Sequence, residues 1–93
     1  MKITVRFYGV VYDITDIREW QTELKEDSKI HDLLNTIAFA FPELKELIYH
    51  GDELRKDYLV VSMNNEDVTG MDGFDSSLSD GDTVSLMPPI GGG

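Results

Sequence analysis

Cysteine is absent from the sequence. Its absence excludes disulfide bonds, thiolate nucleophiles, cysteine-ligated zinc and iron–sulfur clusters. Any covalent chemistry of this chain must therefore use a group other than a side-chain thiol.

Basic residues are also scarce: 8 Lys and Arg face 18 Asp and Glu, a formal charge of −10. This charge excludes nucleic acid and anionic membranes as natural partners, because both are polyanions. It favours a partner with a basic surface. Solubility alone, or a salt-adapted or thermophilic source, would explain the same charge.

Long hydrophobic runs are missing as well, since no stretch reaches the ~20 apolar residues that a membrane span needs. Met1-Lys2 leads directly into an alternating segment, which is not typical of a signal peptide. We therefore expect a cytoplasmic protein. Its 93 residues, 41% hydrophobic and 28% charged, are typical of one globular domain.

Alternating patterns predict the first and last strands of a sheet. Residues 2–8 place Ile3, Val5 and Phe7 on one face, and residues 82–87 place Val84 and Leu86 inward. A second strand is expected over 20–25, a nearly apolar central strand over 58–63 and a short return strand over 66–68. Residues 9–19 and 50–57 are interpreted as loops, and 64–65 and 80–81 as turns.

A single long helix is predicted between the second and third strands. Ser28 is its expected N-cap, and Pro42 ends it near Phe41. Its apolar stripe, spaced i, i+3, i+4, i+7, should face the sheet and comprises Ile30, Leu33, Leu34, Ile37, Ala38 and Phe41. Phe39 lies opposite this stripe, and we expect it to pack under the next segment, where residues 42–48 could form a short helix.

One main helix that crosses a mixed sheet of about five strands is an α+β architecture. We expect the last strand to lie parallel beside the first, at the centre of the sheet. The predicted domain is 1–87, followed by a tail at 88–93.

The tail, Pro88-Pro89-Ile90-Gly91-Gly92-Gly93, has a composition unlike the rest of the chain. Two prolines stop strand pairing, and three glycines have no side chain to bury. Fully extended, it could reach roughly 20 Å at ~3.3 Å per residue. A frayed end is one interpretation. The other is a thread that carries the carboxylate of Gly93 into a narrow enzyme channel.

These residues resemble a known family. The tail is similar to the Pro-Pro-Val-x-Gly-Gly end of the small subunit of molybdopterin synthase and of small archaeal modifier proteins, which are related to ThiS-type sulfur carriers. The segment 78–84, Leu-Ser-Asp-Gly-Asp-Thr-Val, resembles the Leu-x-Asp-Gly-Asp-x-Val that precedes it in that family. Similarity also covers 3–8 and 60–65.

The resemblance implies a ubiquitin-like β-grasp fold and a reactive terminal Gly92-Gly93 pair. The Gly93 carboxylate would be adenylated by a ubiquitin-activating-type enzyme that uses ATP, with no tightly bound cofactor on this chain. It would then become a thiocarboxylate that donates sulfur, most readily to molybdopterin (molybdenum cofactor) synthesis beside the large synthase subunit. Alternatives are a modifier joined to target lysines and a non-covalent adaptor with an inert tail. No self-contained active site is readable, so the chain would be an enzyme only as a synthase subunit.

Partner binding is expected at the tail and near it. If the first and last strands are neighbours, Tyr8 and Met87 share an exposed face beside Pro88, Pro89, Ile90 and Gly91. Asp67 stands near where the resembling family often has an apolar residue. His31 and His50 have no visible partners. No metal site is expected, because Asp72, Asp75, Asp80 and Asp82 lack calcium-loop spacing.

Overall fold

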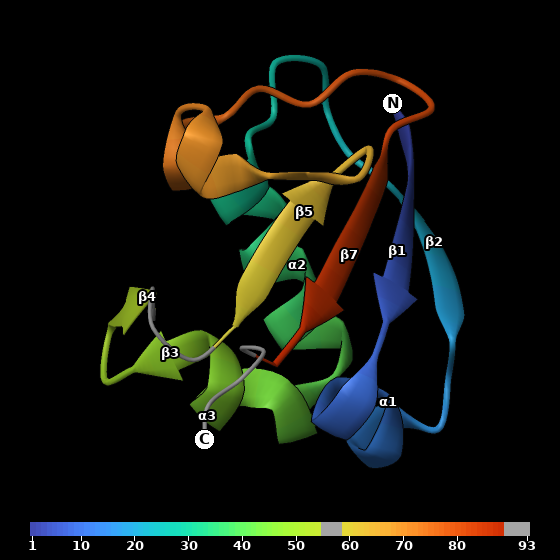
Figure 1. Cartoon of the computed structure of the whole chain (residues 1–93), viewed down its shortest axis with the longest axis vertical. Helices are drawn as coiled ribbons and strands as arrows, with labels where there is room; N and C mark the ends of the chain where they lie inside the picture. Colours follow the sequence, from blue (N-terminus) through green and yellow to red (C-terminus); the bar gives the residue numbers. More distant parts are fainter. Residues whose placement is uncertain (55–58, 89–93) are drawn as a thin grey trace.

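The computed structural model describes residues 1–54 and 59–88. In these residues a five-stranded mixed sheet carries one main helix on its inner face, as Figure 1 shows. The order of the strands across the sheet is β2-β1-β7-β5-β6, with bounds Glu19–Glu23, Lys2–Phe7, Thr83–Met87, Val60–Met63 and Glu66–Asp67. This arrangement confirms the predicted α+β class and its β-grasp topology.

Shorter elements connect these strands. Among the described residues, the α-helices are α1 (Gly9–Thr15), α2 (Ile30–Ala40) and α3 (Lys45–Ile48), and the 3₁₀ turns are η1 (Pro42–Leu44), η2 (Val68–Gly70) and η3 (Gly73–Asp75). A separate hairpin consists of β3 (Tyr49–His50) and β4 (Glu53–Leu54). No helix in this described part of the chain has the length and apolar run that crossing a membrane requires.

The first and last strands lie parallel at the centre of the sheet, as predicted. Their register runs from Thr4 opposite Thr83 to Phe7 opposite Leu86. β2 pairs antiparallel with β1, and β5 pairs antiparallel with β7. Because β1 and β7 are parallel, both strands finish at the same end of the sheet. Helix α1, which follows β1, therefore lies next to Pro88, which follows β7.

The core lies between the sheet and α2. Five of the six residues of the predicted helix stripe are buried, namely Ile30, Leu33, Leu34, Ile37 and Ala38, whereas Phe41 is half-buried and lies just past the helix end. The stripe meets the inward residues of the two central strands, among them Ile3, Val5, Val84 and Leu86. Burying one such aliphatic side chain contributes ~1.5–3 kcal/mol, so this contact dominates the stability of the domain.

Phe41 completes the core from just beyond the helix end. Its ring makes edge-to-face contacts with Phe7 at 5.4 Å and with Trp20 at 5.1 Å between centroids. Phe39, by contrast, is 88% exposed, so the expectation that it packs under the next segment is wrong. The short helices that follow α2 leave the Phe39 side chain uncovered.

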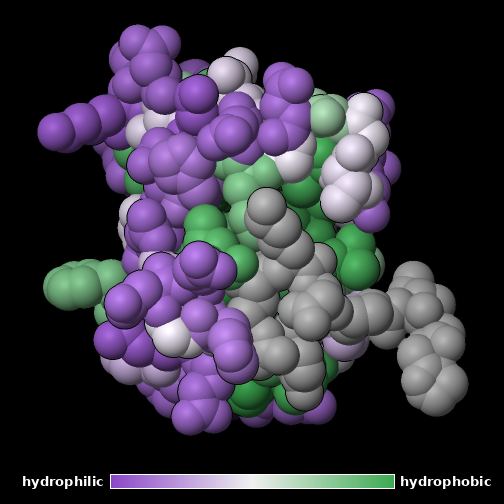
Figure 2. Space-filling view, turned by 90° about the vertical axis from the view of Figure 1, so that its left-hand side faces the viewer, coloured by the Kyte–Doolittle hydropathy of each residue, from purple (hydrophilic) through white to green (hydrophobic). Residues whose placement is uncertain are grey.

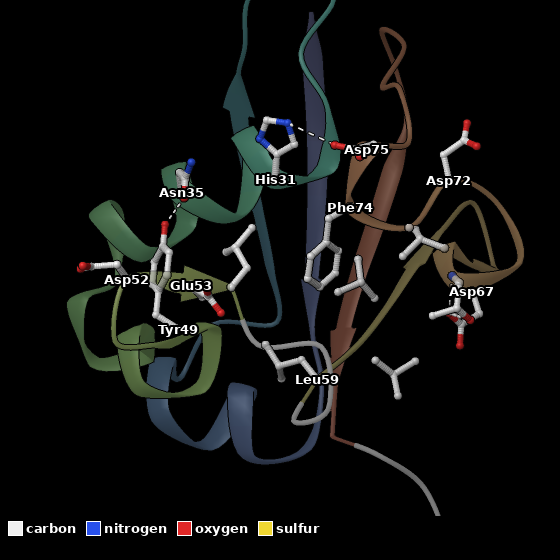
Figure 3. Close-up of a pocket in the computed structure, with 16 residues that line it drawn as sticks. His31, Asn35, Tyr49, Asp52, Glu53, Leu59, Asp67, Asp72, Phe74 and Asp75 are labelled. Atoms are coloured by element: carbon white, nitrogen blue, oxygen red, sulfur yellow. Dashed lines mark hydrogen bonds and ion pairs between the residues drawn. The ribbon is translucent and has the colours of Figure 1, made fainter.

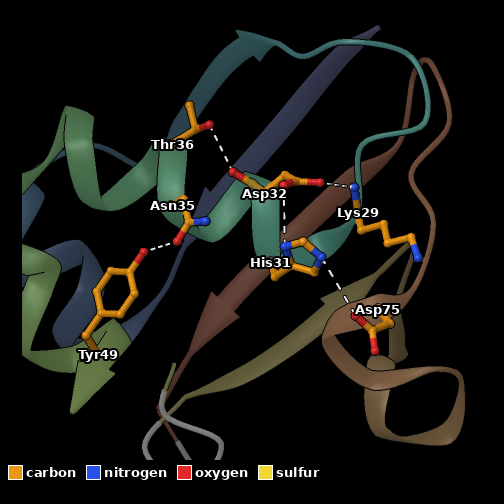
Figure 4. Close-up of polar contacts among 7 residues, drawn as sticks. All are labelled: Lys29, His31, Asp32, Asn35, Thr36, Tyr49 and Asp75. Carbon is orange, nitrogen blue, oxygen red and sulfur yellow. Dashed lines mark hydrogen bonds and ion pairs between the residues drawn. The ribbon is translucent and has the colours of Figure 1, made fainter. Parts of the chain in front are cut away.

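The helix α2 begins one residue later than predicted, with Lys29 rather than Ser28 as its N-cap. The Asp32 carboxylate accepts the Lys29 N–H at 2.9 Å (Figure 4). The Ser28 carbonyl instead accepts the N–H of Leu78 at 3.0 Å. Pairing with the 76–78 segment thus keeps Ser28 out of the helix, and an acidic residue in the first turn takes over the capping.

Two predicted loops contain regular structure. Residues 9–19 include helix α1, which places Val11 in the core and ends at Asp16 in a left-handed conformation. Residues 50–54 take part in the β3–β4 hairpin, which turns at Gly51 with φ of +66°. Residues 55–57 of the second predicted loop, and Tyr58 of the predicted central strand, lie outside the described residues.

The return strand is also shorter than predicted. β6 covers only Glu66 and Asp67, because Val68 turns inward and starts η2. The preceding turn is as expected, with Asn64 and Asn65 both at positive φ, 53° and 70°. Positive φ at both central positions is typical of a tight two-residue hairpin.

The two phenylalanines near the end of α2 provide a matched test of this packing. We expect Phe41→Ala to lower the free energy of unfolding by about 3 kcal/mol, because it removes both ring contacts and leaves a void. Phe39→Ala should change it by less than about 0.5 kcal/mol. Urea denaturation of the two variants measures the difference, and equal losses would contradict the assigned core.

Candidate functional site

The candidate site is the end of the sheet where β7 finishes and the tail begins. Pro88 follows Met87 directly and is the last described residue. The predicted site residues Pro89, Ile90, Gly91, Gly92 and Gly93 lie outside the described residues. The structure therefore shows the base of the tail, where the two central strands, β1 and β7, determine the positions of the neighbouring residues.

Tyr8 and Met87 lie at the same end of these two strands. The Tyr8 N–H donates to the carbonyl of Leu86 at 3.0 Å, which continues the β1–β7 ladder by one residue. Tyr8 is 43% exposed and Met87 is half-buried. Val60, opposite Met87 on β5, adds a third apolar side chain that the sequence did not single out. The strand register alone brings these three residues together.

A polar row crosses the outer face next to these apolar residues. The registers place the following residues side by side across all five strands: Glu19, Arg6, Ser85, Ser62 and Asp67. Arg6 Nε lies 3.3 Å from the Glu19 carboxylate. The pKa of Arg6 is raised, first by its hydrogen bond and charge interaction with Tyr8 and then by Glu19. Arg6 is therefore a permanent positive charge beside the exposed Tyr8 ring.

Asp67 closes this row at the far edge of the sheet. Its carboxylate accepts the Thr69 N–H and the Thr69 hydroxyl, both at 2.9 Å, and so caps η2. These bonds, the backbone one first, lower the pKa of Asp67. Because the folded pKa is lowered, its stabilising effect is present at neutral pH and is lost as the pH falls through that lowered value. The hydrogen bonds to Thr69 thus give a structural reason for the acidic residue Asp67 on the outer face of the sheet.

A groove opens on another side of the domain, between α2, the β3–β4 hairpin and the η2–η3 segment (Figure 3). Its volume is about 770 Å³. Phe74 and Leu59 lie near its centre, and acidic side chains surround them: Asp52, Glu53, Asp67, Asp72 and Asp75. Figure 2 looks onto this side, where apolar surface is enclosed by hydrophilic surface.

Contacts within and beside this groove are structural. His31 contacts the carboxylates of Asp32 at 3.4 Å and Asp75 at 3.7 Å, so the expectation that it lacks partners is wrong (Figure 4). Asn35 hydrogen-bonds the hydroxyl of Tyr49 and ties α2 to the hairpin. These contacts hold α2 against η3 and β3 and assemble no nucleophile–base pair in the described residues.

Asp80 and Asp82 accept hydrogen bonds that hold the turn before β7. Asp80 accepts the Lys2 N–H at 2.7 Å, and Asp82 accepts the Ser79 N–H at 2.7 Å and the Asn64 amide at 3.0 Å. Within residues 1–54 and 59–88, no three His, Asp or Glu side chains gather in a way that could hold a metal ion.

Known proteins of similar sequence cover the chain from end to end. The family model described as the ThiS family matches residues 5–93. Small archaeal modifier protein 3 from Haloferax volcanii is 26% identical over 93 residues, with all of both chains covered. The molybdopterin synthase sulfur carrier subunit from Chlamydomonas reinhardtii is 31% identical, again over 93 residues and all of both chains.

Solved structures share the fold. The crystal structure of small archaeal modifier protein 1 from Haloferax volcanii superposes with a TM-score of 0.85 at 20% identity and full coverage of both chains. A complex of subunits 1 and 2 of the molybdopterin-converting factor from Helicobacter pylori contains a chain with a TM-score of 0.63, 26% identity and full coverage of both chains. The β-grasp fold, the tail included in the family match and the full-length relatives agree, and the chain belongs to the ThiS family.

Proposed function

We propose that this chain is a sulfur carrier that works through the carboxylate of Gly93. One observation carries the proposal: the ThiS family match extends through the Gly-Gly tail, to residue 93. The 31% identity to a molybdopterin synthase sulfur carrier subunit, over the whole of both chains, supports molybdenum cofactor biosynthesis as the destination of the sulfur.

The proposed chemistry begins with activation, because a carboxylate is a poor acyl donor. An oxygen of Gly93 attacks the α-phosphorus of ATP, and pyrophosphate leaves. A sulfide equivalent then attacks the acyl carbon of the adenylate, AMP leaves, and a terminal thiocarboxylate remains. The ubiquitin-activating-type partner binds the ATP, and this chain presents the reacting carboxyl group.

The folded domain contributes to this reaction by positioning the tail. The central strands fix Pro88, and the Tyr8, Met87 and Val60 side chains beside it offer an apolar surface for docking. An enzyme that holds this surface places the tail in its channel, so the attack becomes effectively unimolecular. A large synthase subunit would use the same surface and tail, as the subunit 1–subunit 2 pairing of the Helicobacter pylori protein suggests.

A second candidate function is protein modification. Its support is the full-length similarity to small archaeal modifier protein 3. Here the ε-amine of a target lysine would displace AMP from the Gly93 adenylate and form an isopeptide bond. Lysine conjugates that carry a Gly93 remnant, found by peptide mass spectrometry of the host proteome, would favour this reading. A non-covalent adaptor would need neither reaction.

Removal of Gly92 and Gly93 tests the activation step shared by both functions. With the activating enzyme of the same organism, we expect ATP–pyrophosphate exchange to fall at least about 100-fold, because the remaining terminus no longer reaches the nucleotide. Gly91→Ala is the matched control and should stay within about threefold, since it keeps the terminal pair. Undiminished exchange by the truncated chain would contradict a role of Gly92 and Gly93 in activation, and no exchange by the full chain would support the adaptor instead.

Docking through the outer face has its own test. We expect Tyr8→Ala to raise the KM of the chain as substrate for adenylation about tenfold with little change in kcat, since exposed aromatic residues are common interface anchors. Phe39→Ala removes a still more exposed ring on the helix side and should leave KM unchanged. An identical response of the two variants would argue against this docking surface.

A further inference from the structure

Gly9 touches the base of the tail more closely than any side chain would allow. It is the first residue of α1 and has a φ of +56°. A Cβ atom built on Gly9 would lie 2.8 Å from both Cδ and Cγ of Pro88. Real Cβ contacts essentially never fall below 3.0 Å, so a side chain here would force a displacement.

The sheet itself creates this contact. Phe7 and Leu86 are the last paired residues of the parallel β1–β7 ladder, and the Tyr8 N–H still bonds the Leu86 carbonyl. Two residues beyond Phe7 and Leu86, the chain reaches Gly9 on one side and Pro88 on the other. The closest approach therefore falls at the point where the tail leaves the domain.

Pro88 cannot relieve a collision by rotating its side chain, because its ring is closed onto its own backbone nitrogen. A displacement at Pro88 must therefore move the backbone that leads into the tail. Misplacement of a reacting group by about 1 Å can cost 100-fold in rate.

The other described glycines have no such role. Gly51, Gly70, Gly73 and Gly81 have nothing within 4 Å of a built Cβ. Gly73 is especially informative, because its φ of +59° nearly equals that of Gly9. The two positions share the backbone requirement for glycine and differ in the contact with Pro88.

We propose that Gly9 is a positioning residue: its missing side chain lets Pro88 pack against the start of α1 and so sets the direction of the tail. This inference rests on the proposed function for its consequence, the delivery of the Gly93 carboxylate. The close approach of Gly9 and Pro88 itself is a property of the free domain.

The decisive comparison is Gly9→Ala against Gly73→Ala, because both variants carry the same backbone penalty. In ¹H–¹⁵N and ¹³C NMR spectra we expect Gly9→Ala to shift the resonances of residues 88–93 and to remove the nuclear Overhauser effect between residue 9 and the Pro88 ring. Gly73→Ala should leave both unchanged. With the activating enzyme, kcat/KM for adenylation should fall about tenfold for Gly9→Ala and stay within about twofold for Gly73→Ala.

A second variant keeps the test decisive if Gly9→Ala is poorly folded. Pro88→Ala removes the ring atoms that would collide with a side chain at residue 9. The double variant Gly9→Ala/Pro88→Ala should therefore have nearly the same kcat/KM as Pro88→Ala alone. Tail resonances that respond equally to Gly9→Ala and Gly73→Ala would overturn the inference. Shifted tail resonances with unchanged adenylation would overturn the positioning role and leave the proposed function intact. A wild-type chain that is not adenylated would refute the proposed function, and the NMR comparison would still decide the role of Gly9 in tail direction.

Discussion

The parallel pairing of β1 with β7 is the contact on which the rest of this domain depends. It places the first and last strands side by side at the centre of the sheet, and all the elements between them in the sequence form the connection between these two parallel strands. Helix α2 covers the inner face of that pair, while the outer face stays open. Both strands finish at the same end of the sheet, so Tyr8, Gly9, Met87 and Pro88 gather there, and the tail starts from a central strand.

The sequence was most informative where hydrophobic periodicity was strong. Period two predicted β1 and β7, and the stripe of α2 predicted its buried face. Helix α1 was missed because its segment mixes Gly9, Asp13 and Thr15, and only Val11 enters the core. The β3–β4 hairpin has two residues in each strand, too few for any period to show. Tertiary contacts decide such elements, and local propensity does not.

The candidate site was predictable to a similar degree. Alternation along two parallel strands was enough to put Tyr8 and Met87 on one face. Val60 and the Gly9–Pro88 contact depend on register and on close backbone approach between distant segments, which no local pattern encodes. Asp67 shows the converse, since its bonds to Thr69 explain within its own turn why an acid stands on this face.

The most direct measurement is the intact mass of the chain isolated from its native host, before and after treatment with a thiol-selective alkylating reagent. A thiocarboxylate adds about 16 mass units, as oxidation of one of the four methionines also would. Alkylation separates the two, because the chain has no cysteine to react. The sulfur-carrier account predicts a fraction labelled at Gly93. A chain that carries the unmodified mass and takes up no label, isolated while its pathway is active, would contradict it.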